Sequence, residues 1–122
     1  MPVAGSFNIA AFVASQNAQI QFQGGALQTA LTAWLNGIPT AMNVGGAGNP
    51  DSAAQRTVYN LIPIGRDLLN SVTNSTLDQF AANTVSVYLN RCCRAIANAL
   101  SGGRISAAQN VALLALYNAT WP

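Results

Sequence analysis

Arginine is the residue whose type and spacing in this chain could do chemistry. All five basic residues are arginines, in a sequence of 122 residues without lysine, histidine or glutamate. A guanidinium group is always charged and can hold a phosphate through two parallel hydrogen bonds. Four arginines are therefore candidate nucleic-acid ligands. One lies on a predicted helix 49–72, two on a longer predicted helix 76–100 and one just beyond it: Arg56, Arg91, Arg94 and Arg104.

These four arginines form a small basic strip if they converge in the fold. One subunit would bind nucleic acid weakly, because affinity grows with the number of phosphates neutralised. An array of many copies would coat a nucleic acid firmly and without sequence preference. DNA is thus a candidate partner. The alternative is that the arginines pair with aspartates or cover helix ends.

No other group of residues supports catalysis. General acid–base catalysis most often uses His, Glu or Lys, and none of them occurs. The adjacent pair Cys92 and Cys93 has no His or Lys to activate a thiol, although Arg91 and Arg94 are near enough in sequence to lower a thiol pKa. We interpret both cysteines as small apolar side chains buried in a helix, and without histidine they do not complete a zinc site. We therefore expect no enzymatic activity, no cofactor and no metal.

The composition predicts burial against other molecules. Charged residues make up 7% of the chain, against about a quarter in ordinary soluble domains, and 51% of the residues are hydrophobic. So small a domain cannot easily hide that much apolar surface, so we expect other copies, or lipid, to cover it. A secreted monomer with an uncharged polar coat is the alternative. The aromatic candidates for self-association are Phe7, Phe12, Trp34 and Trp121.

The elements that would position these residues are helices. Helical spacing of apolar residues, with Gly, Pro or a capping side chain at the ends, predicts helices at 6–20, 26–35, 49–72, 76–100 and 106–120. The first two would be joined by Gly24-Gly25 and the second would end at Asn36-Gly37. The third would open at Asn49-Pro50-Asp51 and break or kink at Pro63 and Gly65.

Two shorter segments differ from this helical pattern. Residues 37–49 are predicted to be a Gly-rich loop, whose glycine spacing matches neither a P-loop nor a dinucleotide fingerprint. Residues 19–23 alternate as a short strand would, which leaves their structure ambiguous. The sequence as a whole predicts an all-α fold, with a bundle of four to five helices in a single helical domain, residues 1–122.

Neither export nor membrane insertion is indicated. The first residues contain no basic side chain, which a signal peptide would carry. No stretch reaches the ~18 consecutive apolar residues of a spanning helix. The apolar composition is compatible with a membrane partner, but no segment of the sequence indicates one.

The whole chain resembles the small, all-helical major capsid proteins of archaeal rod-shaped, filamentous and spindle-shaped viruses. The likeness lies in the helices rich in Ala, Asn and Gln, the segment Gly45 to Asn49, the glycine pairs Gly24-Gly25 and Gly102-Gly103, and the few arginines. It implies a helix bundle that assembles into helical virions, whose subunits wrap DNA through basic residues in the rod-shaped members. The five arginines without lysine depart from that pattern and fit better a shell held by apolar faces.

These observations lead to one expected function and two alternatives. We expect a structural subunit that self-assembles through apolar helix faces into a helical virion or filament, with copies of itself as its main partner and nucleic acid as a candidate content. The first alternative is a small helical adaptor or packaging accessory protein. The second is a lipid-associated or pilus-like fibre subunit. The expected location is the virion, with the cytoplasm as the alternative.

Overall fold

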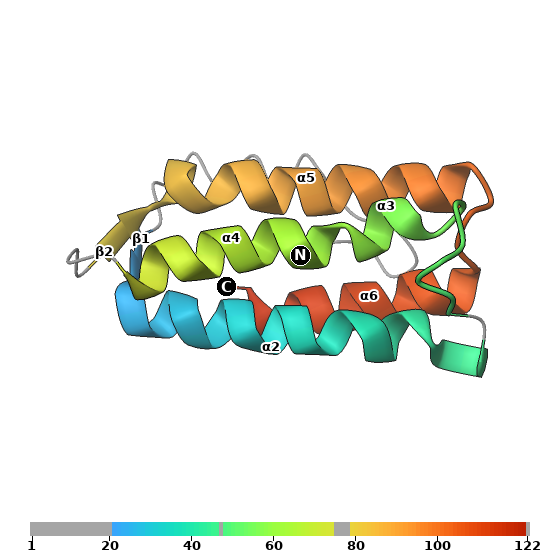
Figure 1. Ribbon diagram of the computed structural model, residues 1–122, viewed down its shortest axis with the longest axis horizontal. Helices are drawn as coiled ribbons and strands as arrows, with labels where there is room; N and C mark the ends of the chain where they lie inside the picture. The colour runs from blue at the N-terminus through green and yellow to red at the C-terminus, as the bar shows by residue number, and fades with distance from the viewer. Residues whose placement is uncertain (1–20, 47, 75–78, 122) are drawn as a thin grey trace.

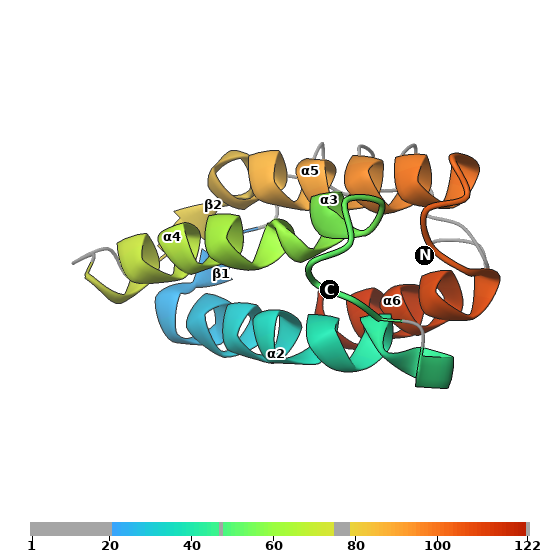
Figure 2. The same cartoon turned by 45° about the vertical axis from the view of Figure 1, so that its right-hand side comes forward.

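The computed structural model describes residues 21–46, 48–74 and 79–121. The helices and strands in this part are β1 (Gln21–Gln23), α2 (Gly24–Met42), the 3-10 turn η1 (Val44–Gly46), α3 (Arg56–Tyr59), α4 (Leu61–Thr73), β2 (Gln79–Ala81), α5 (Ala82–Ser101) and α6 (Ala107–Thr120). Figure 1 shows the helices side by side, with α3 and α4 between α5 and α2. Helix α6 packs along α2, as the turned view of Figure 2 also shows. The predicted all-α bundle is confirmed.

Helix α2 is longer than the sequence predicts. It continues through Asn36-Gly37 and Pro39 to Met42, so the predicted helix end at Gly37 is wrong, as is a loop from residue 37. A proline inside a helix costs about 3 kcal/mol. Burying one large apolar side chain contributes about 1.5–3 kcal/mol, and both Ile38 and Met42 in these last turns are fully buried. Their packing therefore outweighs the local helix-ending signals.

The start of the next helix also differs from the prediction. The Oδ1 of Asn49 accepts a hydrogen bond from the backbone N–H of Asp51 (3.0 Å), and the N–H of Asn49 donates to the Oε1 of Gln55 (2.9 Å). These bonds hold a turn, since Asn side chains compete with helical hydrogen bonds in this way. The helix begins at Arg56 instead of at Asn49-Pro50-Asp51.

The break in this region falls at Asn60, between α3 and α4, and not at Pro63 and Gly65. Pro63 is the third residue of α4, a position where a backbone N–H has no helical partner to lose. Gly65 continues the helix and is buried. A Cβ atom at Gly65 would lie 2.5 Å from the Cδ2 of Leu35 and closer still to the hydroxyl of Tyr88. The glycine thus permits close packing of α4 on α2 and α5 instead of ending the helix.

A short strand, β2, stands in the first part of the predicted helix 76–100. Residues Gln79–Ala81 pair antiparallel with Gln21–Gln23, with Phe22 opposite Phe80, and α5 starts only at Ala82. The alternation noted at residues 19–23 therefore corresponds to a strand over its last three residues. The predicted helix 6–20 lies outside the described residues, as do Phe7 and Phe12.

The connection between α5 and α6 agrees with the sequence prediction. Gly103 takes a left-handed φ of 69°. The N–H of Arg104 donates to the carbonyl of Ala99 and that of Gly103 to the carbonyl of Leu100, the bond pattern of a Schellman helix end. Ser106 then caps α6, and its side chain and that of Gln109 each accept a bond from the other's backbone N–H. Gly102-Gly103 and Ser106 are confirmed as helix end and helix start.

The core is built around Trp34 of α2. The Trp34 ring makes edge contacts with Tyr117 (ring centroids 6.0 Å apart) and Trp121 (6.4 Å). Trp34 is fully buried and Trp121 is 6% exposed. The prediction that Trp34 and Trp121 form self-association surfaces is therefore wrong, because both side chains are used inside the subunit.

Candidate nucleic-acid interface

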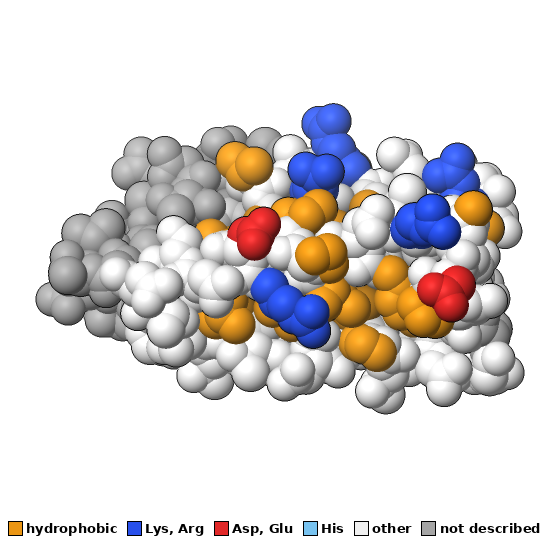
Figure 3. Space-filling model, viewed as in Figure 1, with side chains coloured by type: hydrophobic (Ala, Val, Ile, Leu, Met, Phe, Trp, Pro, Cys, Tyr) orange, Lys and Arg blue, Asp and Glu red, His pale blue; other side chains and the backbone are white. Residues whose placement is uncertain are grey.

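The charged side chains of the described residues lie on one side of the bundle. Helices α2 and α6 contain none, whereas α3, α4, α5 and the turn after α5 carry all five arginines. Figure 3 shows arginine side chains spread over α5, α3 and α4 on the face of Figure 1, with aspartate side chains and apolar patches among them. All five arginines are exposed to solvent. This face is the candidate nucleic-acid interface.

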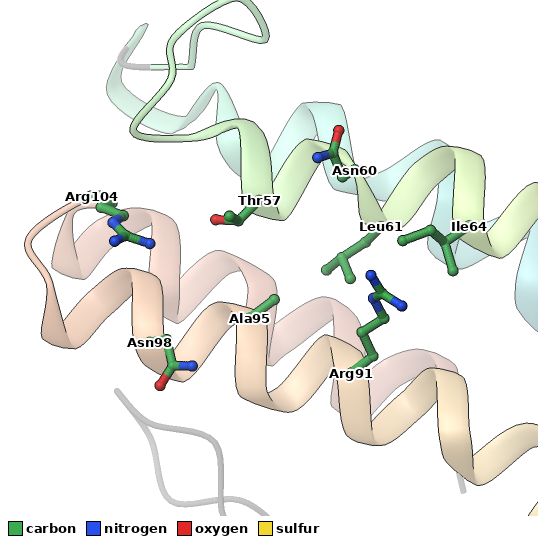
Figure 4. Close-up of a pocket in the computed structure, with 8 residues that line it drawn as sticks. All are labelled: Thr57, Asn60, Leu61, Ile64, Arg91, Ala95, Asn98 and Arg104. Carbon is green, nitrogen blue, oxygen red and sulfur yellow. The ribbon is translucent and has the colours of Figure 1, made fainter.

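A groove crosses this face between α5 and the α3–α4 pair. It has a volume of about 220 Å³ and contains two of the predicted arginines; its lining residues are Thr57, Asn60, Leu61, Ile64, Arg91, Ala95, Asn98 and Arg104. Figure 4 shows Arg91 reaching from α5 toward Leu61 and Ile64 at one end, and Arg104 near Thr57 at the other. None of the described lining residues is acidic.

Helix periodicity and the α5 end together position the two arginines. Arg91, Ala95 and Asn98 follow each other at intervals of four and three residues, which places them on one face of α5. Arg104 is held by the Schellman bonds, and its side chain lies against Gly102, where an added Cβ would be 3.5 Å from the Arg104 Nε. The small Ala95 between them is half-buried and leaves the middle of the groove open.

The other two predicted arginines lie outside this groove. The Nη2 of Arg56 donates to the backbone carbonyl of Asp51 (3.3 Å), and the Nε of Arg94 donates to the Oδ1 of Asn90 (3.0 Å). The fold therefore brings together Arg91 and Arg104 and leaves Arg56 and Arg94 on the surrounding surface. Of the four candidate arginines, only Arg91 and Arg104 therefore line one groove.

The cysteine pair is buried and has the properties of packing residues. Both thiols are free. Burial raises the pKa of Cys92 to about 12 and that of Cys93 to about 11. A reactive cysteine needs a lowered pKa, so the effect of burial prevails over the neighbouring Arg91 and Arg94. The interpretation of Cys92 and Cys93 as buried apolar side chains is confirmed.

Neither a metal site nor a spanning helix occurs in the part of the chain that the structure describes. Residues 21–46, 48–74 and 79–121 contain no group of three His, Cys, Asp or Glu side chains that could hold a metal ion. Within the same ranges, no helix is both long enough and apolar enough to cross a membrane.

No protein-family model, curated protein or solved structure matches this chain.

Sequence reasoning missed the polar residues that share the groove with the arginines. Asn98 could have been found, because it lies seven residues after Arg91 on the same helix face. Thr57 and Asn60 could not, because they belong to another helical segment and reach the groove only through the packing of α3 and α4 on α5.

Proposed function

We propose that this protein is a structural subunit that assembles with copies of itself into a helical virion or filament. The observation that carries the proposal is the division of the bundle into a side with arginines, on α3, α4 and α5, and a side without charge, on α2 and α6. Small soluble domains keep charges of both signs over their surface to oppose association. A side formed by two helices without any charge is suited to contact another protein surface.

Helix α6 provides the most apolar part of this side. A stripe of small apolar residues at intervals of four is exposed along it: Ala107, Val111, Ala115 and Ala119. Val111 is 51% exposed. Side chains of this size let a second helix approach closely, so that packing contacts replace contacts with water. The stripe extends over most of α6 and could be covered by a neighbouring helix.

Helix α2 adds a long polar but uncharged surface. It has 19 residues and is therefore about 28 Å long. Its exposed residues include Gln28, Thr32 and Asn36, which can form hydrogen bonds without the desolvation that a buried charge would require. The two helices together give an extended contact surface, as repeated contacts in a filament need.

The arginine-bearing side would then be free to contact an enclosed nucleic acid. Repetition of one weakly basic face along a filament multiplies the number of phosphates neutralised, and affinity grows with that number. This arrangement also agrees with the resemblance to small helical capsid proteins of archaeal viruses, in which subunits are held by helix faces.

Electron microscopy of the purified protein at neutral and acid pH tests the proposal, with absorbance at 260 and 280 nm on the same sample. Regular filaments or shells are expected, and a high 260/280 ratio in particles isolated from the source would place nucleic acid inside. Subunits that stay monomeric or dimeric under all conditions would contradict assembly.

A charge introduced on α6 locates the contact surface. Val111→Asp is expected to abolish assembly, because it places a carboxylate in the apolar stripe, while helical content stays unchanged. The matched control is Asn70→Asp, which adds the same charge at an exposed position of α4 and should leave assembly intact. If both variants assemble normally, α6 is not the contact surface.

A further inference from the structure

The two arginines of the groove have no partner within the described protein. No hydrogen bond or ion pair to the described residues occupies the guanidinium of Arg91 or Arg104, whereas Arg56 and Arg94 each donate one. Neither Asp51 nor Asp67 lines the groove. Two guanidinium groups without a partner therefore border a groove that contains no carboxylate of the described residues, and this arrangement favours the binding of an anion.

The positions of the arginines select the kind of anion. Ser101, the last residue of α5, lies ten positions after Arg91, which corresponds to about 15 Å along the helix axis. Figure 4 shows the two side chains at opposite ends of the groove, with Ala95 between them. A single phosphate ion reaches only one of them, whereas a chain of linked phosphates lying along the groove reaches both.

The remaining lining residues match a sugar–phosphate chain better than exposed bases. Thr57, Asn60 and Asn98 offer hydroxyl and amide groups, while Leu61, Ile64 and Ala95 form the apolar part. Backbone contacts of this type position a nucleic acid without reading its sequence. Among the described residues, no aromatic side chain lines the groove, so this part of the chain provides no platform on which unpaired bases stack.

We propose that this groove binds a short stretch of nucleic-acid backbone, with Arg91 and Arg104 each holding a phosphate at one end. The site rests on the proposed function for its choice of nucleic acid as the source of the phosphates. In this proposal Arg91 and Arg104 contact phosphates directly, whereas Arg56, Arg66 and Arg94 lie outside the binding groove. Because the bases are not contacted, a duplex binds at least as tightly as a single strand, and base composition has no effect.

Fluorescence anisotropy with labelled DNA tests the site on dispersed subunits, at concentrations below assembly. Arg91→Gln and Arg104→Gln are expected to weaken binding, and each should reduce the slope of log affinity against log salt by about 1. The matched control is Arg66→Gln, which removes one exposed charge from α4 outside the groove lining. If the Arg66 variant reduces the slope as much as the other two, the groove is not the site.

Two further measurements separate the groove from a general effect of charge. Ala95→Leu fills the middle of the groove without changing charge and is expected to weaken DNA binding; unchanged affinity in a folded variant would overturn the proposal. Inorganic phosphate should compete only at far higher concentration than DNA phosphates, because it reaches one arginine at a time. Equal competition would identify a site for free phosphate instead.

The outcome is independent of assembly. Subunits that bind DNA through Arg91 and Arg104 but form no filaments would contradict the proposed function and leave the groove intact. If the Arg91→Gln and Arg104→Gln variants form normal filaments and bind DNA as tightly as the parent protein, the groove is contradicted and the proposed assembly function stands.

Discussion

The indole Nε1 of Trp34 on α2 donates a hydrogen bond of 2.9 Å to the hydroxyl of Tyr88 on α5. The same hydroxyl donates to the backbone carbonyl of Leu61 in the first turn of α4, at 2.7 Å. One phenol oxygen thus joins three helices in the buried core. Leu61 also lines the groove that holds Arg91, so this contact connects the centre of the bundle with the wall of the candidate site.

Removal of the Tyr88 hydroxyl should destabilise the fold. In Tyr88→Phe, the Trp34 N–H loses its acceptor and the Leu61 carbonyl loses its donor, and an unsatisfied buried polar group costs about 1–3 kcal/mol. Urea unfolding followed by circular dichroism measures the change. Tyr59→Phe is the control, because Tyr59 is only partly buried and should change stability much less. Equal stability of Tyr88→Phe and the parent protein would contradict the role of this bond.

The close packing at Gly65 can be tested with a single methyl group. Gly65→Ala places a Cβ against the side chains of Leu35 and Tyr88, and overpacking of this kind typically costs about 1–3 kcal/mol. Gly25→Ala is the matched control, because nothing lies within 4 Å of a Cβ at that position of α2, where alanine favours the helix. Thermal unfolding should show opposite signs for the two variants. A stabilised Gly65→Ala would disprove the packing.

The end of α5 depends on the left-handed backbone at Gly103. Gly103→Ala should destabilise the protein by about 1–2 kcal/mol, because a Cβ atom is strained at φ 69°. Gly103→Asn should reduce the free energy of unfolding by less, since asparagine tolerates this conformation. Chemical denaturation of both variants makes the comparison. Identical losses for alanine and asparagine would show that the left-handed conformation is not the cause.

Stability should fall at alkaline pH. Burial raises the pKa of Cys92 and of Cys93 from 9.0 to about 12 and about 11, so the folded state holds these protons more tightly than the unfolded state does. The stabilisation is complete below pH 9 and is lost as pH rises through 11 and 12. Urea unfolding at stepped pH measures this loss, and Cys92→Ala should show a shallower decline over the same window. A free energy of unfolding that stays constant from pH 9 to 11 would contradict the prediction.

The sequence by itself determined the features that depend on nearby residues. The apolar stripes predict an all-α bundle, because a helix places residues three and four positions apart on one face. Gly102-Gly103 and Ser106 predict the end of α5 and the start of α6, because each forms its hydrogen bonds within a few residues. The burial of Cys92 follows from its place in such a stripe, four residues after Tyr88 and four before Ile96.

Only the tertiary structure decided where local signals give way to packing. Helix α2 continues past Gly37 and Pro39 because Ile38 and Met42 are buried in the core. Gly65 lies within helix α4, where its lack of a side chain leaves room for Leu35 and Tyr88. Trp34 and Trp121 lie inside the subunit. Their hydrophobicity alone did not indicate this, because large apolar side chains occur both in cores and at interfaces. The groove unites Arg91 with Thr57 and Asn60 because α5 packs against α3 and α4. Periodicity in the sequence does not predict that contact, because the contact joins residues about thirty positions apart.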